Sequence, residues 1–206
     1  MASAYLSRTP SSASNRKTFT ISTWVKRALI GGVTQSLVYV GNNSNNRTAL
    51  NFEGTNDDFL IQNRISGTIN TALHTNRKFR DTSAWYHIVL AVDTTQATDS
   101  DRVKLYINGV QETSFQTETY PSQNVDFFIN NNQEHNIGRR VDNNSSFFDG
   151  STAHFHLTDG TAYAASTFGE TDSTTGIWKP KTAPSVTYGT NGFFLKFENS
   201  GAFGTD

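Results

Sequence analysis

The segment 85–111 constrains the fold of this chain more than any other part of the sequence. Residues 85–93 form a β-branched and aromatic run, and residues 102–107 alternate apolar and polar side chains. The second run ends at Asn108-Gly109, a dipeptide that favours a tight hairpin turn because both residues accept a positive φ. The segment therefore predicts antiparallel strands joined by short turns.

Short strands separated by Gly, Asn, Ser and Thr loops are predicted along the whole chain. They lie at residues 4–8, 19–26, 35–40, 48–53, 58–63, 86–93, 102–107, 110–114, 136–138, 150–158 and 192–198. Long amphipathic stretches with helical spacing are missing. A length of 206 residues suits one domain, which we place at residues 1–206. We expect an all-β fold, an antiparallel two-sheet jelly-roll sandwich.

Composition and charge exclude several classes of protein. The 17 basic residues are scattered and the formal net charge is −1, so the sequence carries no nucleic-acid footprint. The absence of cysteine excludes disulfides and thiolate metal sites. No apolar run reaches the ~20 residues of a membrane span. No signal peptide is visible at the N-terminus, so action outside a cell would require another route of release, such as lysis.

Four segments in order along the chain resemble one superfamily. They are 19–26 (FTISTWVK), 85–89 (WYHIV), 105–109 (LYING) and 148–153 (FDGSTA). All four are similar to strands of concanavalin A-like domains of the laminin G and pentraxin type. The resemblance extends over residues 4–197 and implies a β-sandwich that binds or decorates rather than catalyses.

The C-terminal part carries a narrower resemblance. Residues 168–180 and 188–193, together with 4–9 and 83–87, resemble laminin-G-like structural proteins of marine tailed bacteriophages. This resemblance implies a virion-surface component, either a capsid decoration or a tail-fibre or receptor-binding module. Its expected partners are other virion proteins and cell-surface glycans, and it is expected to be oligomeric on the particle. Such proteins often extend at both ends, so the chain is either a compact single module or a piece of a longer protein.

Two other functions stay open at this point, a free carbohydrate-binding lectin and a divergent glycan hydrolase. A retaining glycosidase needs two carboxyl groups about 5–5.5 Å apart, and the superfamily's glucanases place them in a Glu-x-Asp-x-x-Glu pattern. This sequence has no such pattern, and Gly-x-Ser-x-Gly is also absent. We therefore expect a non-enzymatic protein without catalytic residues.

The ligand-binding candidates are amide-rich loops and one tryptophan. Amide side chains both donate and accept hydrogen bonds, which suits a polar ligand, but Asn is also an ordinary turn former. Trp24 and Trp85 lie within apolar runs and are expected in the core. Trp178 is expected to cap the sandwich edge or to pack on a neighbouring subunit. The candidate residues are Asn42, Asn43, Asn45, Asn46, Asn143, Asn144 and Trp178.

Metal-binding candidates are sparse. Calcium is the favoured ion because it takes Asp, Asn and backbone oxygens, and Asp93, Asp99 and Asp101 lie in or beside one loop. The same residues are common in turns. His154 and His156 are two residues apart, so on a strand they would share a face and begin a zinc site, or would simply face solvent. His87 is expected to pack beside Trp85 as a partly buried, hydrogen-bonded residue.

Overall fold

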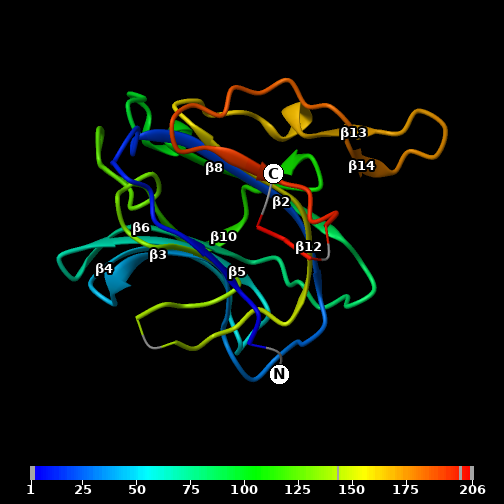
Figure 1. Ribbon diagram of the computed structural model, residues 1–206, viewed down its shortest axis with the longest axis horizontal. Helices are drawn as coiled ribbons and strands as arrows, with labels where there is room; N and C mark the ends of the chain where they lie inside the picture. The colour runs from blue at the N-terminus through cyan, green and yellow to red at the C-terminus, as the bar shows by residue number, and fades with distance from the viewer. Residues whose placement is uncertain (1–2, 143, 200, 205–206) are drawn as a thin grey trace.

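Two antiparallel sheets pack face to face in the computed structural model, which describes residues 3–142, 144–199 and 201–204 (Figure 1). The seven-stranded sheet has the order β1 (Leu6–Arg8), β11 (His135–Ile137), β3 (Gln35–Asn43), β4 (Asn46–Phe52), β5 (Phe59–Ile65), β6 (Thr68–Thr75), β10 (Phe115–Thr119). The six-stranded sheet has the order β15 (Phe193–Leu195), β12 (Gly150–Asp159), β2 (Thr18–Arg27), β7 (Tyr86–Asp93), β8 (Val103–Ile107), β9 (Val110–Gln111). The predicted all-β sandwich is confirmed.

Strand periodicity builds the core between the sheets. Along β2, Phe19, Ile21 and Val25 point inward, and they pack in one cluster with Leu50 and Ile61 of the opposite sheet. Successive strand residues point to opposite faces, so each strand contributes every second side chain to this core. Full burial of such a side chain contributes roughly 1.5–3 kcal/mol. This core fixes which residues face outward on both sheets.

The hairpin predicted from Asn108-Gly109 is present between β8 and β9. Asn108 has φ 50° and Gly109 has φ 84°, as a type I′ turn requires. The bounds of β7 agree with the prediction, whereas β6, β10 and the short pair β13 (Gly169–Thr171) and β14 (Trp178–Pro180) were not predicted. These strands are short, or rich in Thr and Asn, and they lack the apolar alternation that marks a strand in sequence.

Two long segments cover the outer faces of the sandwich. Residues 160–192, which include β13 and β14, run over the six-stranded sheet, and residues 138–149 run along the seven-stranded sheet (Figure 1). As a result, β2 is buried along nearly its whole length on both faces. Within the described part of the chain, no helix is long and apolar enough to span a membrane.

Candidate functional site

The outer face of the seven-stranded sheet carries a polar cluster built from three neighbouring strands. Tyr39 of β3 pairs with Ala49 of β4, which in turn pairs with Gln62 of β5. Two residues further along the same face, Arg47 of β4 pairs with Arg64 of β5. The alternate residues of these strands, such as Leu50 and Ile61, enter the core. The strand period therefore places the polar residues outside.

The two asparagine-rich loops meet at this cluster. The hydroxyl of Tyr39 donates a 3.2 Å hydrogen bond to the carbonyl of Asn43, in the turn between β3 and β4. The Arg140 guanidinium, from the second loop, lies 5.9 Å from the centre of the Tyr39 ring. Burial raises the pKa of Tyr39, and the nearby Asp142 carboxylate raises it further. Two loops that are far apart in sequence thus form one surface.

The predicted amide residues support the turns in which they lie. The Oδ1 atom of Asn43 accepts 2.9 Å hydrogen bonds from the backbone N–H groups of Asn45 and Asn46. Oδ1 of Asn46 accepts one from Ser66, and Oδ1 of Asn144 accepts one from Arg139. Each bond uses an amide oxygen, so the amide nitrogens are left to donate elsewhere. The turn-forming and the ligand-binding interpretations are therefore compatible.

Not every predicted ligand residue is part of this surface. Asn42 is exposed at the end of β3, beside the turn, and Asn143 lies outside the described residues. Trp178 lies on the other side of the sandwich, over the outer face of the six-stranded sheet. The prediction that it caps the sandwich fits this position. The Asn-rich loops and Trp178 therefore do not form one site.

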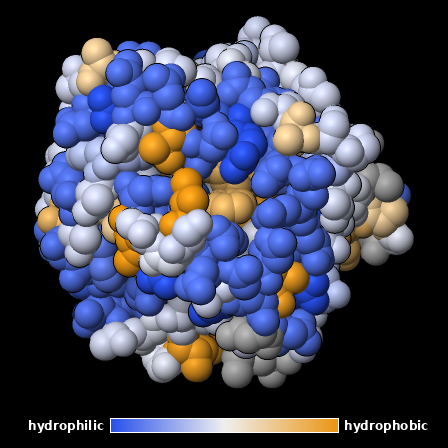
Figure 2. All heavy atoms as spheres, turned by 90° about the vertical axis from the view of Figure 1, so that its left-hand side faces the viewer, coloured by the Kyte–Doolittle hydropathy of each residue, from blue (hydrophilic) through white to orange (hydrophobic). Residues whose placement is uncertain are grey.

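Arginine and glutamine side chains complete the polar cluster. Arg47 donates from Nη1 to the Ser44 carbonyl (2.8 Å) and from Nη2 to Oε1 of Gln62 (2.7 Å). Arg64 also directs Nη1 at the Ser44 carbonyl, at 3.5 Å. Burial lowers the pKa of Arg47, and the positive charges of Arg140 and Arg64 lower it further. Figure 2 shows that the side of the molecule with these hairpin turns is largely hydrophilic.

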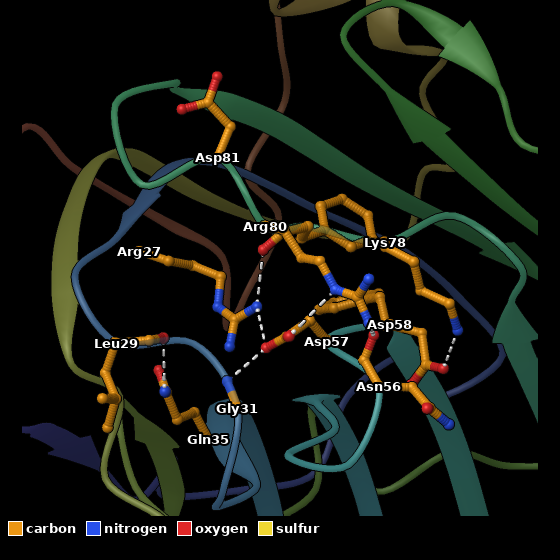
Figure 3. Close-up of polar contacts among 12 residues, drawn as sticks. Arg27, Leu29, Gly31, Gln35, Asn56, Asp57, Asp58, Lys78, Arg80 and Asp81 are labelled. Atoms are coloured by element: carbon orange, nitrogen blue, oxygen red, sulfur yellow. Dashed lines mark hydrogen bonds and ion pairs between the residues drawn. The ribbon is translucent and has the colours of Figure 1, made fainter.

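A second polar cluster holds the loops at another edge of the sandwich. Arg27 is fully buried, and its Nη1 lies 2.7 Å from the Phe79 carbonyl and 3.1 Å from Oδ1 of Asp57 (Figure 3). The guanidinium also lies over the Phe52 ring, 4.8 Å from its centre. Asp57 also accepts a 2.7 Å hydrogen bond from the backbone N–H of Gly31. The arrangement ties three loops together.

The two adjacent carboxylates of this edge are engaged in ion pairs. Burial alone would raise the pKa of Asp57, but the Gly31 N–H and the Arg27 charge outweigh it and lower that pKa. Asp58 behaves in the same way, because hydrogen bonds from Lys78, His74 and Gln116 outweigh its burial. Figure 3 shows Asp57 directed at Arg27 and Asp58 at Lys78. Both carboxylates are therefore ionised and paired with a cation. An ionised carboxylate has no proton to give, so neither is suited to act as a general acid at neutral pH.

The predicted calcium residues lie at the turn between β7 and β8 but have protein partners. Asp93 accepts hydrogen bonds from Thr18, Thr95 and Gln96. Asp101 forms a 2.9 Å ion pair with Lys104. Among the residues that the structure describes, no group of three or more His, Cys, Asp or Glu side chains is arranged to hold a metal ion. Calcium binding at Asp93, Asp99 and Asp101 stays a prediction.

His87 does not pack beside Trp85 as predicted. Trp85 is 40% exposed, so the expectation that it is in the core is also wrong. His87 is buried and stacks on Trp24, with ring centres 4.7 Å apart. Trp24 is buried on the outer face of the six-stranded sheet and not between the sheets. Strand alternation sends it outward, since its neighbour Val25 points into the core.

The hydrogen bonds of His87 fix its tautomer and exclude one kind of catalysis. Nδ1 of His87 lies 3.0 Å from Nε1 of Trp178, and Nε2 lies 2.9 Å from Oγ of Ser22. An indole N–H can only donate, so Nδ1 is the acceptor and the proton of the neutral ring is on Nε2. His87 therefore donates to Ser22 and cannot take its proton as a general base.

A β-bulge interrupts the regular alternation of β12 on which the His154–His156 prediction depended. It lies between Ala153 and His156, and His154 has φ 49°. The rings of both histidines nevertheless lie against Phe194, 5.7 Å and 3.9 Å from its centre. His156 is buried, stacks on Phe194 at 3.9 Å, and lies 2.9 Å from the hydroxyl of Tyr188. The solvent-facing alternative is therefore wrong for His156, whereas His154 is half-buried. Zinc binding by this pair stays a prediction, and the described residues include no group of three or more ligating side chains.

The sequence did not reveal Tyr39, Arg47, Gln62 and Arg64 as a cluster. Tyr39 and Gln62 alternate with apolar inward residues, so the pattern indicates that they face outward. The inward neighbours of Arg47 and Arg64 are the polar Thr48 and Asn63, which hydrogen-bond to each other, so the pattern gives no such indication for the two arginines. Which of them stand side by side depends on the register between β3, β4 and β5. That register is set by hairpin turns whose exact length the sequence leaves open.

Two cavities lie beside the edge strand β1, one toward β15 and one toward the start of β12. One of about 310 Å³ is lined by residues that include Leu6, Phe193 and Leu195, and one of about 430 Å³ by residues that include Leu6, Ile137 and Phe148. Their linings are mainly apolar. They are separate from the polar cluster at Tyr39.

Comparison with known proteins places the chain in a family. The laminin G family model, described as the concanavalin A-like lectin/glucanases superfamily, matches residues 2–167. No curated protein matches the chain. A similar solved structure is a heptameric SAP-like pentraxin from Limulus polyphemus, with 12% identity, a TM-score of 0.52, and coverage of 92% of this chain and 87% of that one.

Two further solved structures share the fold. Domain 4 of the extracellular arabinanase AbnA from Geobacillus stearothermophilus, in complex with arabinotriose, is 20% identical with a TM-score of 0.52, over 73% of this chain and 64% of that one. Tailspike protein 2 of Escherichia coli O157:H7 bacteriophage CAB120 is 11% identical with a TM-score of 0.54, over 79% of this chain and 22% of that one. The chain thus spans less than two thirds of either protein. Since the family model covers most of its length, the chain belongs to the concanavalin A-like lectin/glucanases superfamily, as a laminin G-type domain.

Proposed function

We propose that this chain is a non-catalytic glycan-binding module on the surface of a bacteriophage virion. The observation that carries the proposal is the junction of the two Asn-rich loops around Tyr39, next to Arg47 and Gln62. Sugars present many hydroxyl groups, and amide and guanidinium groups supply matching donors and acceptors. The exposed Asn45 and the half-buried Arg47 offer these two chemistries, while the buried Tyr39 holds the Asn43 carbonyl in place.

The comparisons support glycan binding through the fold. The similar arabinanase domain was solved with arabinotriose bound, and the similar tailspike is a protein of a phage. A sandwich of this shape is therefore compatible with a sugar ligand. The ion-paired state of Asp57 and Asp58 favours binding over hydrolysis.

The virion location rests on the resemblance of residues 168–180 and 188–193 to phage structural proteins. Other virion proteins are the expected partners, and the module is expected to be oligomeric on the particle, as a capsid decoration or a tail-fibre or receptor-binding part. Mass spectrometry of purified virions that encode the chain tests this location. Repeated failure to detect the chain would contradict it, and imaging of the intact particle would separate head from tail.

Glycan binding is tested on a glycan array with the full chain. Gln62→Ala should weaken binding because it removes the partner of Arg47. Gln111→Ala is the matched control, since Gln111 is exposed on β9 of the other sheet. Equal binding by both variants would contradict the proposed surface. The alternative of a free lectin predicts strong binding by the isolated monomer that is lost when calcium is chelated.

A further inference from the structure

Two arginines face each other across adjacent strands of the polar cluster. Arg47 of β4 is the direct cross-strand partner of Arg64 of β5. Like charges in this position repel and destabilise a sheet. Both guanidinium groups also approach one atom, the carbonyl oxygen of Ser44. The fold therefore concentrates positive charge at one point of the surface.

No acidic side chain within the described ranges forms an ion pair with either of these two arginines. Other arginines of the chain have carboxylate partners, such as Arg27 with Asp57 and Arg77 with Glu112. Neither Arg47 nor Arg64 forms an ion pair with a described residue, and the Nε atoms of both are buried without a hydrogen-bond partner. Within the described ranges the two guanidinium groups therefore have only neutral hydrogen-bond acceptors, the Ser44 carbonyl and Gln62.

Asp142, the acid that acts electrostatically on Arg47, is already engaged. Asp142 accepts two hydrogen bonds from Arg140, at 2.6 Å to Nε and 2.8 Å to Nη2, in a bidentate pair. This fork geometry satisfies both charges of that pair. The Asp142 carboxylate raises the pKa of Arg47, but this effect is smaller than the lowering by burial. An external anion is the remaining group that would balance Arg47 and Arg64.

We propose that Arg47 and Arg64 form the anion subsite of the glycan-binding surface, and that its ligand is an acidic sugar bearing a carboxylate or a sulfate ester. This inference rests on the proposed glycan-binding function and names its ligand class. A guanidinium presents a planar fork of N–H donors that matches such oxyanions. The sugar ring then lies over the turn of β3 and β4, where Asn43, Asn45 and Asn46 have amide nitrogens to donate to hydroxyl groups.

Isothermal titration calorimetry of the full chain tests the inference with three probes of similar length. They are an oligogalacturonate (carboxylated), a carrageenan oligosaccharide (sulfated) and a maltooligosaccharide (neutral). We expect binding of at least one acidic probe, and at least tenfold weaker binding of the neutral one. Raising the salt concentration should weaken the acidic complex, since part of its affinity is electrostatic.

Variants separate a specific anion subsite from general attraction. Arg64→Gln should reduce affinity for the acidic probe about tenfold or more. Arg64→Lys keeps the charge but not the fork of N–H donors, so its affinity should lie between those of the wild type and Arg64→Gln. Lys196→Gln, which removes an exposed charge on the far sheet, is the matched control and should bind like the wild type. Thermal melting should show Arg64→Gln to be at least as stable as the wild type, because the substitution relieves repulsion.

The outcomes distinguish the inference from the proposed function. Binding of neutral glycans alone, or wild-type affinity of Arg64→Gln for the acidic probe, would overturn the inference and leave glycan binding intact. Failure of the folded chain to bind any glycan on a broad array would overturn both. Loss of affinity in Lys196→Gln equal to that in Arg64→Gln would show general charge attraction and would also overturn the subsite.

Discussion

Nε1 of Trp178 donates a 3.0 Å hydrogen bond to Nδ1 of His87, and this contact joins the 160–192 segment to the outer face of the six-stranded sheet. Trp178 also lies against Gly109, where a Cβ atom would come within 2.7 Å of the indole. Tyr188, in the same segment, lies 2.9 Å from Nδ1 of His156. Two buried histidines thus anchor the covering segment.

The stability of the protein should fall on acidification. Burial lowers the pKa of His87 and of His156 to about 3, and that of His135 to about 4. The unfolded chain takes up these protons below about pH 6.5, whereas the folded chain stays neutral down to its lowered pKa values. The free energy of unfolding therefore decreases from about pH 6.5 downward, by about 1.4 kcal/mol per pH unit for each histidine.

Urea unfolding at pH 7.5 and pH 5 measures this dependence. His156→Gln should flatten the slope, because it removes one of the groups that bind protons only in the unfolded state. An unfolding free energy that is unchanged between the two pH values would contradict the burial of these neutral rings.

Trp178→Phe should destabilise the protein by about 1–3 kcal/mol, because it leaves the buried Nδ1 of His87 without its donor. The urea midpoint measures the change. Trp85→Phe is the matched control, since Trp85 is 40% exposed, and surface substitutions usually change stability by less than about 0.5 kcal/mol. Equal effects of the two variants would show that the contact contributes nothing.

Asp57→Ala should cost about 3–5 kcal/mol, because it leaves the fully buried Arg27 without its counter-charge. A second substitution, Arg27→Met, should recover part of that loss by removing the unpaired charge. Asp126→Ala, which breaks an exposed ion pair with Arg16, should cost less than about 1 kcal/mol. If the double variant is less stable than Asp57→Ala, the ion pair is not the dominant interaction.

Gly109→Ala should destabilise more than Gly160→Ala. Both glycines have a positive φ, 84° and 94°, so alanine is strained at both positions, by roughly 1–2 kcal/mol. At Gly109 the new Cβ would also collide with Trp178, whereas no atom lies within 4 Å at Gly160. The difference between the two unfolding free energies reports the packing of Trp178 on the sheet, and equal values would contradict it.

The sequence predicted those features that depend on residues close together along the chain. The β-branched and aromatic run identified β7, and period-2 alternation identified β8. The positive φ values that Asn108 and Gly109 tolerate identified the hairpin between β8 and β9. The family resemblance predicted that these strands form two packed sheets. The Asn-rich loops were also correctly identified as turns, because the amide oxygens of Asn43 and Asn46 accept backbone hydrogen bonds there.

By itself, the sequence determined the strands with a clear β-branched or alternating pattern and the turn at Asn108-Gly109, since these follow from side-chain chemistry and backbone preference within a few residues. Tertiary structure decided what the strands bring together. The register between β4 and β5 set Arg47 opposite Arg64, and the pairing of β12 with β15 set His156 against Phe194. A one-residue shift in pairing moves every side chain of a strand to the other face. The polar cluster and its charge therefore exist only once the register is fixed by the packed core.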